Sequence, residues 1–316
     1  MYLFPLSRTD SKGKNMNKIL KILVQTICIF LILIPATVFS AGNKADTCDT
    51  RHPVILAHGT GGADKLLGIV DYWWGISDAL ENEGAEVFIT RVDGMGGTEE
   101  KAEQFRDEFL KIQTMCPPET KFNIIGHSHG ALYTRFAISN LGLSPHVSSL
   151  TSIAGPHRGM VLADRIVKNF PNPLKSITGT TLDFLYAYFM GDSNPDSAKN
   201  VYDVTTLYMK YVFNPGTPNM GGVYYQSWAA KVKYGCPNII LDPVWRLLAE
   251  AEGPNDGLVS VESAKWGNFC GEESGAWWSP GCDHLNIIGH LFGITPGFYA
   301  PDFYVNLVAD LKNQGF

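Results

Sequence analysis

The chain has 316 residues, of which 45% are hydrophobic, and its formal net charge is −6. This length suits one large domain or two small ones, and the hydrophobic share supplies a sizeable core. The acidic balance gives no support for binding to nucleic acid, which needs a basic surface.

The N-terminal segment has the pattern of a secretory signal peptide. Four lysines precede an apolar run from Ile22 to Val38, which ends in small residues near Ala41. This order of basic, apolar and small residues is typical of a segment that is removed during export. We therefore expect residues 1–40 to be a signal peptide, with a better-proportioned start at Met16, and the mature protein to be secreted.

The alternative for this segment is a membrane anchor, because the apolar run approaches the length of a membrane span. Pro35 and the cleavage-type end favour removal instead. Removal leaves a chain from Ala41 onward with 20 basic and 30 acidic residues, and we expect no transmembrane segment in it.

Strands and helices alternate in the first half of this mature chain. A continuous apolar run predicts a strand at 53–57, and further strands are predicted at 86–92 and 147–153. Helical patterns predict helices at 72–81 and 99–112. In the first of these helices we expect Trp73 and Trp74 to face inward. Such alternation is typical of an α/β fold, in which helices cover both faces of a mostly parallel sheet.

The strongest functional pattern lies between these elements. An apolar strand, Phe122 to Ile125, is followed by Gly126-His127-Ser128-His129-Gly130 and by a helical pattern from Ala131 to Ile138. G-x-S-x-G between a strand and a helix is typical of a nucleophile elbow, which holds the serine in a strained turn with its hydroxyl exposed. A Cβ on either glycine would collide with the neighbouring strand or helix. An ordinary glycine-bounded turn is the alternative, and the flanking elements favour the elbow with Ser128 as nucleophile.

A second glycine-rich turn, from His58 to Gly62, follows the first predicted strand directly. In a serine hydrolase, a loop at this place contributes one donor of the oxyanion hole, and the residue after the nucleophile contributes the other. We therefore expect the backbone N–H groups of Thr60 and His129 to form this hole, although a plain glycine loop has the same pattern.

After residue 157 the alternation stops, and residues 160–213 have a helical pattern. This segment is rich in Phe, Tyr and Leu, most of all at 182–190. Such a segment beside a catalytic turn is either additional core or a lid whose inner face meets lipid when it opens. We favour a helical lid insertion.

Two histidines and three aspartates are candidates for the base and the acid. In the chain order nucleophile, acid, base, only His284 and His290 follow a plausible acid. His284 comes directly after a glycine-rich loop. Asp256 lies in an Asn-Asp-Gly turn that is also a common hairpin signal, and its rivals are Asp242 and Asp283.

The mature chain retains five cysteines, an odd number, and in an oxidising compartment most of them should pair. Cys48 and Cys116 each precede a predicted strand, and therefore fall at one edge of a parallel sheet. Cys270 and Cys282 bracket one glycine-rich loop. We expect these two disulfides, with the fifth thiol free or paired between chains.

Seven stretches of the chain occur together in one known family: Val54–Gly59, Leu67–Gly75, Asn123–Gly130, Ala154–Gly159, Leu241–Pro243, Asn255–Val259 and His284–Asn286. In these stretches the chain resembles the secreted true lipases of Gram-negative bacteria, related to those of Pseudomonas and Burkholderia. The resemblance implies an α/β-hydrolase fold and hydrolysis of long-chain acylglycerols at a lipid–water interface. It implies a catalytic triad of Ser128, Asp256 and His284, and oxyanion donors at Thr60 and His129.

The resemblance leaves the partners and the reaction class partly open. Some members of the family need a membrane-bound foldase in the periplasm, so such a partner is allowed here. A phospholipase or an acyltransferase on the same scaffold is the alternative within the enzymes, and a non-catalytic lipid-binding relative is the alternative outside them. The family's cysteine after the acid turn is replaced, with Glu262 at about that position, so the family's disulfide is missing.

The resemblance also implies a calcium site, at positions that correspond to Asp242, Asn286, His290 and Ile294. The family has an aspartate where this chain has Asn286, and a glutamine where it has His290. Calcium prefers charged oxygen ligands, whereas an imidazole suits softer metals. We therefore expect that no cofactor is required and that calcium binding is weak or lost. A contact of Asp242 with Asn286 or His290, helped by a disulfide through Cys282, would hold the loop instead.

Overall fold

The structure is a computed structural model that describes residues 45–61, 65–66, 70–169, 195–239, 241–290 and 295–316. The chain divides into two units, Met1–Asn43 and Lys44–Phe316, and every described residue belongs to the second. The expected signal peptide lies outside the described residues.

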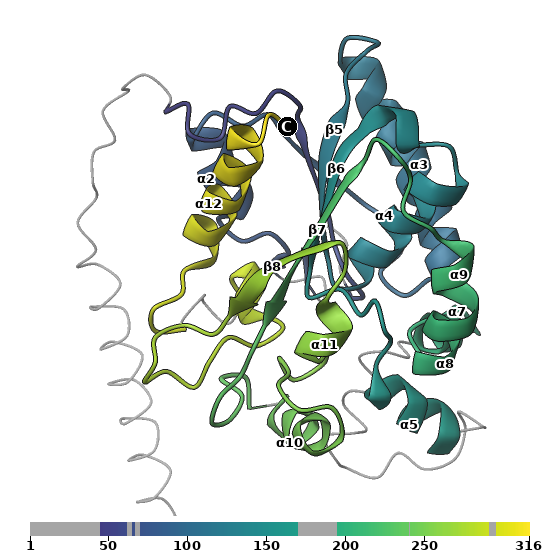
Figure 1. The fold of residues 1–316 in the computed structure, drawn as a ribbon, viewed down its shortest axis with the longest axis vertical. Coiled ribbons are helices and arrows are strands. Elements are labelled where there is room, and N and C mark those ends of the chain that lie inside the picture. Colours follow the sequence, from purple (N-terminus) through teal and green to yellow (C-terminus); the bar gives the residue numbers. More distant parts are fainter. Residues whose placement is uncertain (1–44, 62–64, 67–69, 170–194, 240, 291–294) are drawn as a thin grey trace, which may run out of the picture. The chain divides into compact units, whose positions relative to one another are not determined.

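Six parallel strands form the central sheet of this unit, in the order β4-β1-β5-β6-β7-β8 (Figure 1). A separate antiparallel pair, β2 and β3, follows β1 in the chain. The strands are β1 (Val54–Ala57), β2 (Lys65–Leu66), β3 (Val70–Asp71), β4 (Val87–Thr90), β5 (Phe122–His127), β6 (Val147–Ile153), β7 (Tyr224–Ala230) and β8 (Asn268–Glu273).

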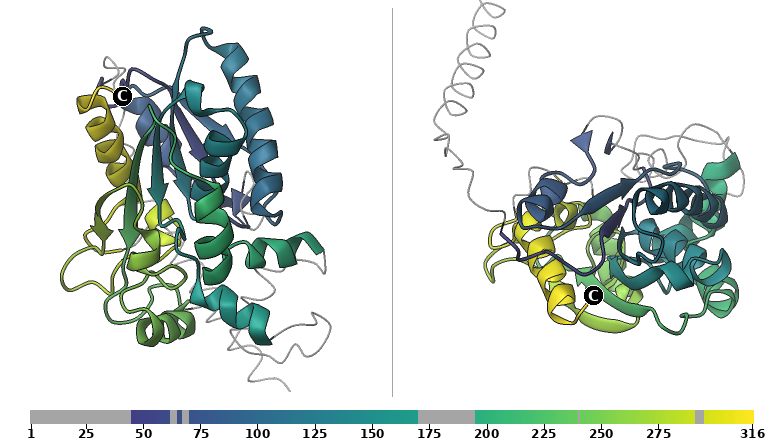
Figure 2. Two further views of the ribbon diagram at one scale, coloured as in Figure 1. Left: turned by 45° about the vertical axis from the view of Figure 1, so that its right-hand side comes forward. Right: turned by 90° about the horizontal axis from the view of Figure 1, so that it is seen from above.

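Helices α2 and α12 lie on one side of this sheet, and α3 and α4 lie on the other (Figures 1 and 2). The helices are α2 (Ile76–Asn82), α3 (Thr98–Met115), α4 (His129–Asn140), α5 (Val161–Asn169), α7 (Pro195–Tyr202), α8 (Thr206–Tyr208), α9 (Asn214–Gly216), α10 (Asp242–Ala251), α11 (Val261–Ala264) and α12 (Ala300–Asn313). Short 3₁₀ turns at η1 (Ser144–His146) and η3 (Asn286–Ile288), and a π-helical turn at η2 (Met209–Phe213), complete the set.

Side chains along β1 alternate between two hydrophobic cores. Val54 and Leu56 pack with residues of α2 and α12, whereas Ile55 and Ala57 pack with residues of α3 and α4. Because both faces of the strand are buried, its sequence is one continuous apolar run. The predicted α/β fold with helices on both faces is therefore confirmed.

The helix expected at 72–81 begins later, at Ile76, and residues 72–75 form a turn. Gly75, directly before the helix, has a positive φ of 67°, a conformation that glycine adopts readily. Trp73 is fully buried, but Trp74 is 53% exposed. The prediction that both tryptophans face inward is wrong for Trp74, because the two residues follow each other in a turn and not along a helix.

The described part of the insertion at 160–213 is helical, as expected, and consists of α5, α7, α8 and η2. A third hydrophobic cluster packs these elements against α10 and against Leu258 and Val259. The aromatic stretch at 182–190 lies outside the described residues. The segment therefore contacts the chain near Asp256, which is one place where a lid would act.

The two disulfides expected from the sequence are not formed, and all five described cysteines are free thiols. Cys48 packs in the core beside α12, whereas Cys116 packs in the core beside α3. The sheet lies between these two cores, so the first pairing is wrong. The second pairing is not formed either: Cys270 Sγ lies 3.3 Å from Gln226 Oε1 on the adjacent strand, and Cys282 is a fully buried free thiol.

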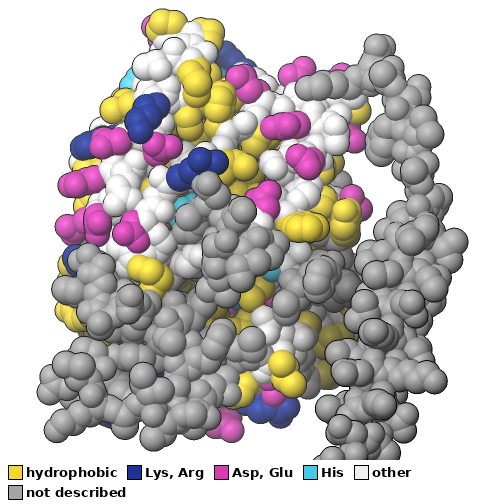
Figure 3. Space-filling view, turned by 180° about the vertical axis from the view of Figure 1, so that it is seen from behind, with side chains coloured by type: hydrophobic (Ala, Val, Ile, Leu, Met, Phe, Trp, Pro, Cys, Tyr) yellow, Lys and Arg dark blue, Asp and Glu magenta, His cyan; other side chains and the backbone are white. Residues whose placement is uncertain are grey.

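Acidic side chains are spread over the face of the molecule shown in Figure 3, among fewer basic ones. This distribution agrees with the acidic composition of the chain. Among the described segments, no helix combines the length and the apolar character needed to cross a membrane.

Candidate active site

Ser128 lies in a strained turn between β5 and α4, at the carboxyl edge of the sheet (Figure 1). Its φ of 55° and ψ of −126° are unusual for a residue with a side chain. A Cβ at Gly126 would come within 2.7 Å of the Ala131 nitrogen, and one at Gly130 would collide with the Ala57 carbonyl of β1. The two glycines therefore allow the tight turn that the sequence predicted.

The structure brings Ser128, His284 and Asp256 together in a continuous hydrogen-bonded line. Ser128 Oγ lies 2.9 Å from His284 Nε2, and His284 Nδ1 lies 2.7 Å from Asp256 Oδ2. Asp256 is 1% exposed and His284 is 4% exposed. Such a line of nucleophile, base and acid can move a proton from the serine hydroxyl to the imidazole.

The acid is held by its own turn. Asp256 Oδ1 accepts hydrogen bonds from the N–H groups of Leu258 at 2.9 Å and Val259 at 2.7 Å, which leaves Oδ2 for the imidazole. The backbone N–H of His284 also donates to the Asp256 carbonyl, at 2.9 Å. Two contacts thus join the loop that carries Asp256 to the loop that carries His284, so the relative position of the two loops is fixed.

The turn after β1 passes directly against the nucleophile. A Cβ at Gly59 would come within 2.8 Å of Ser128 Cβ, so only glycine fits there. Thr60 Oγ1 lies 3.4 Å from Nδ1 of His129, which is the first residue of α4. The first N–H groups of a helix have no partner within the helix. Thr60 and His129 therefore lie on adjacent turns beside Ser128, and their role as oxyanion donors stays a prediction.

Three ring side chains hold this turn in place. The backbone N–H of Gly59 donates to Tyr72 Oη at 2.8 Å, and this hydroxyl lies 2.6 Å from His127 Nδ1. Tyr133 Oη donates to the His58 carbonyl at 2.9 Å. Neither Tyr72 nor His127 was predicted from the sequence to have a role, although both lie in motifs that carry the family resemblance.

Burial determines the protonation of the other histidines at the elbow. It lowers the pKa of His127 and that of His129 well below the ordinary histidine value, so both rings are neutral at pH 7. Burial also lowers the pKa of Lys101, next to His129, to about 7. His127 and His129 therefore flank the nucleophile in the chain without adding charge, whereas Lys101 changes its charge near pH 7.

The rival candidates for base and acid have other partners. His290 Nε2 lies 2.9 Å from the Tyr72 carbonyl oxygen. The Asp283 carboxylate accepts backbone N–H groups from Asn238, Leu285 and Asn286, each at 2.9 Å. Burial raises the pKa of Asp283, which directly precedes His284 in the chain. Asp283 therefore shapes the loop that carries His284 and does not contact the imidazole.

Three of the four positions of the expected calcium site are described, and each of them has another hydrogen-bond partner. Asp242 binds Arg246 and the backbone N–H of Cys236, and Asn286 Nδ2 donates to the His290 carbonyl at 3.0 Å. Ile294 lies outside the described residues. The expected contacts of Asp242 with Asn286 or His290 are absent among the described residues, because Arg246, one helical turn further along α10, holds the carboxylate. The weak or lost calcium binding expected from the sequence therefore stays a prediction.

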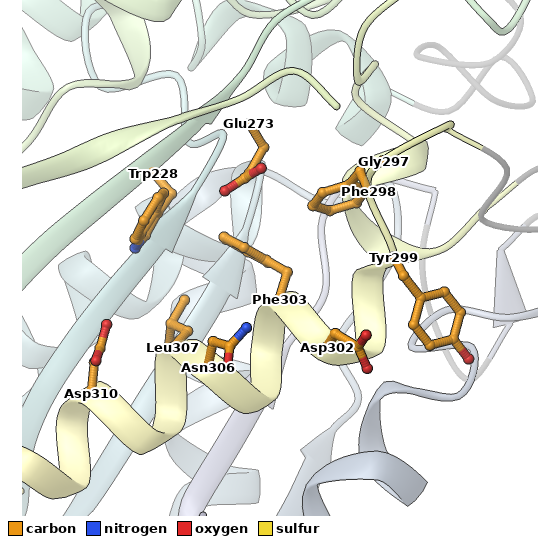
Figure 4. Close-up of a pocket in the computed structure, with 10 residues that line it drawn as sticks. All are labelled: Trp228, Glu273, Gly297, Phe298, Tyr299, Asp302, Phe303, Asn306, Leu307 and Asp310. Carbon is orange, nitrogen blue, oxygen red and sulfur yellow. The ribbon is translucent and has the colours of Figure 1, made fainter. Parts of the chain in front are cut away.

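A separate cavity of about 590 Å³ lies between α12 and the ends of β7 and β8. Figure 4 shows Trp228 and Phe303 in its wall, with the carboxylates of Glu273, Asp302 and Asp310 around them. None of the three residues aligned at the elbow lines this cavity, and it contains no basic side chain. It therefore has no part in the chemistry at Ser128.

Comparisons with known proteins agree on ester chemistry. The family model described as palmitoyl protein thioesterase matches residues 53–212. Triacylglycerol lipase 2 of Saccharomyces cerevisiae is 32% identical over 84% of this chain and 93% of its own length. A triacylglycerol lipase of Vibrio cholerae is 28% identical over 84% of this chain and 91% of its own length.

The solved structures show the fold. The mature form of the Bacillus licheniformis lipase BlEst2 aligns with a TM-score of 0.61 and 19% identity, over 81% of this chain and 91% of that one. The relatives include a yeast enzyme as well as bacterial ones, so they do not single out the secreted Gram-negative type. The fold is that of the α/β-hydrolases. The chain therefore belongs to the family that the thioesterase model describes and that includes the triacylglycerol lipases, and it is a carboxylic ester hydrolase.

Proposed function

We propose that the protein is a secreted triacylglycerol lipase, which hydrolyses long-chain acylglycerols through an acyl-enzyme on Ser128. The observation that carries this proposal is the line from Ser128 Oγ through His284 to Asp256, at 2.9 and 2.7 Å, beside a strained elbow. The similarity to triacylglycerol lipases along most of the chain supports the choice of substrate.

In the first half of the reaction, Ser128 Oγ attacks the ester carbonyl carbon while its proton passes to His284 Nε2. Asp256 orients the imidazole through Nδ1 and stabilises its positive charge. The carbonyl oxygen becomes an oxyanion, which the N–H groups of Thr60 and His129 stabilise by roughly 3 kcal/mol per donor. His284 then gives the proton to the leaving glycerol oxygen as the C–O bond breaks.

In the second half, water attacks the acyl-enzyme. His284 accepts a proton from the water, and the resulting hydroxide adds to the acyl carbon. The tetrahedral intermediate collapses, the bond to Ser128 Oγ breaks, and the proton returns to the serine. The products are a free fatty acid and the original enzyme.

A second candidate substrate class is the fatty acyl thioester, and the observation that favours it is the match to the palmitoyl protein thioesterase model. The same residues would cleave a thioester by the same two steps, with a thiol as leaving group. Rates on emulsified triolein, on a palmitoyl thioester and on phosphatidylcholine, measured with one preparation, separate these classes. We expect triolein to be hydrolysed fastest.

Labelling with a fluorophosphonate tests the mechanism independently of the substrate. The reagent should attach to Ser128 in the wild type, and Ser128→Ala should be neither labelled nor active. We expect the variant to lose at least about ten-thousand-fold in rate, as is usual for triad nucleophiles. Retention of more than about a hundredth of the rate would contradict the proposal.

Export is the remaining part of the proposal. The basic, apolar and small-residue pattern over residues 1–40 supports removal of a signal peptide. N-terminal sequencing of protein exported by a Gram-negative host should begin at or near Ala41. Expression in that host with and without a periplasmic lipase foldase shows whether such a partner is needed.

A further inference from the structure

Helix α7, in the helical insertion, places a buried amide against both proposed oxyanion donor residues. Asn200 is 1% exposed. Its Oδ1 accepts a hydrogen bond from Thr60 Oγ1 at 3.3 Å, and its Nδ2 lies 3.2 Å from His129 Nδ1. The same Nδ2 donates to the Gly96 carbonyl at 2.9 Å. Because a carbonyl can only accept, this bond fixes which end of the amide faces His129.

The amide also fixes the tautomer of the His129 ring. Asn200 Nδ2 can only donate, so the Nδ1 atom of His129 must accept. The single proton of the neutral ring is then on Nε2, which lies 2.8 Å from Thr98 Oγ1. Lys101 Nζ, 3.3 Å from the same Nδ1, is a second donor to it. The other tautomer, with the proton on Nδ1, would set a donor against two donors, so only the tautomer protonated on Nε2 satisfies the site.

A second contact anchors α7 at this place. The carboxylate of Asp203, directly after α7, accepts the backbone N–H of Thr98 at 2.8 Å. Thr98 begins α3, whose N-terminal N–H groups have no capping side chain of their own. Asp203 is fully buried and paired with Lys199 at 2.8 Å. The end of α7 is therefore tied to the start of α3, and Asn200 is held in position.

We infer that Asn200 is a positioning residue for the oxyanion hole, through which the helical insertion sets the alignment of Thr60 and His129. The inference rests on the proposed function, because it assumes that these two residues stabilise the oxyanion. Such donors work only when they lie about 2.7–3.1 Å from the developing charge. Asn200 does not touch the substrate, and it acts by linking the two side chains that adjoin these N–H groups.

The test compares Asn200→Ala with Asn123→Ala as a matched control. Asn123 is also fully buried and also uses both ends of its amide, with the His52 carbonyl and Ser149 Oγ, but it lies at the opposite end of β5 from Ser128. Both variants should melt at lower temperature. On a soluble p-nitrophenyl ester, kcat per fluorophosphonate-titrated site should fall about 10- to 100-fold for Asn200→Ala only, since misplaced donors cost at most what absent donors cost.

The Michaelis constant separates positioning from general damage. Oxyanion donors act in the transition state, so KM should change by less than about threefold while kcat falls. Affinity for an alkyl boronic acid, which mimics the tetrahedral intermediate, should fall in parallel with kcat. A rise in KM with unchanged kcat, or equal kcat in the two alanine variants, would overturn the inference.

Thr60→Val provides a second variant if Asn200→Ala does not fold. It removes the hydroxyl that donates to Asn200 and keeps the backbone N–H. Its kcat should fall in the same direction, and the double variant should lose less than the product of the two single losses. Full multiplicative losses would overturn the inference. If the wild type is active and these variants are as active as it is, this inference alone is overturned. If the wild type is inactive and is not labelled at Ser128, the proposed function is overturned as well.

Discussion

Asp256 and Asp283 are both buried carboxylates near the proposed base, but they have different partners. Asp256 binds the imidazole at 2.7 Å, whereas Asp283 binds three backbone N–H groups. We expect Asp256→Asn to lower kcat by about ten-thousand-fold, because the amide favours the wrong tautomer of His284. Asp283→Asn retains one carbonyl oxygen as acceptor and should lower the melting temperature more than kcat.

Steady-state rates and melting curves of both variants provide the measurement. A larger loss of kcat in Asp283→Asn than in Asp256→Asn would transfer the role of acid to Asp283. It would also undo the alignment with the lipase family around the Asn-Asp-Gly turn.

The buried amine of Lys101 makes stability depend on pH in a definite direction. Burial lowers its pKa from 10.5 to about 7 in the folded protein, so between these values the unfolded chain binds more protons. The free energy of unfolding must then rise with pH in this window and be lowest below it. Above about pH 9 the raised pKa of thiols, such as that of Cys48 at about 11, acts in the opposite direction.

We therefore expect stability against urea to increase from about pH 7 to about pH 8.5. Lys101→Met, which cannot titrate, should remove this increase. Urea melts of the wild type and of Lys101→Met at several pH values check it. An equal slope in the two proteins would mean that another group is responsible.

Motifs determined which site residues could be predicted from the sequence. Ser128 was predicted because an elbow pattern marks it locally, whereas His284 was one of two candidate bases and was assigned by the family resemblance. Asn200 carries a neutral amide in an ordinary helical stretch, and its partner His129 lies 71 positions away. Only the packing of α7 against the elbow shows its place, so no local pattern could have predicted it.

At the scale of elements, the same limit applies to the edge of the sheet. Strand β1 was predicted because all its residues are buried and a continuous apolar run results. Strand β8 has no fully buried residue, and its sequence, Asn-Phe-Cys-Gly-Glu-Glu, shows no apolar run. This edge strand and its neighbour β7 were not predicted, because the pattern of hydrophobic residues reflects which side chains are buried and not which backbone groups pair in a sheet.

The helical insertion exposes large apolar side chains that a lipid surface could cover. On α8 and η2, Leu207 is 68% exposed and Val212 is 53% exposed. We expect the double variant Leu207→Asp, Val212→Asp to lose about tenfold or more of its rate on emulsified triolein, because two apolar side chains no longer enter the interface. Its rate on a soluble short-chain ester should be unchanged.

Leu110→Asp on α3, where Leu110 is 44% exposed, is the matched control and should leave both rates unchanged. The wild type should show a jump in rate once the substrate exceeds its solubility. Smooth saturation through that point, or an equal loss in the control, would indicate that the insertion is additional core and not a lid.

At the scale of the whole molecule, hydrogen bonds of side chains hold the loop that carries His284. The Asp283 carboxylate accepts hydrogen bonds from three backbone N–H groups, and the Asn286 side chain donates one to the His290 carbonyl. We therefore expect dialysis against EDTA to leave the melting temperature unchanged. Loss of a structural ion worth a few kcal/mol would lower it by about ten degrees, and calcium would restore it. That reversible drop, measured by calorimetry, would show that an ion does bind.

Strands β6 and β7 are neighbours in the sheet, yet about 70 residues separate Ile153 from Tyr224 in the chain. The entropy lost in closing such a loop grows only with the logarithm of its length, so each doubling costs only about 0.6 kcal/mol. Insertions and deletions between these strands therefore leave their register nearly undisturbed. In evolutionary terms, the segment that would meet the substrate can change in length while Ser128, Asp256 and His284 stay fixed, so specificity can diverge without loss of the catalytic frame.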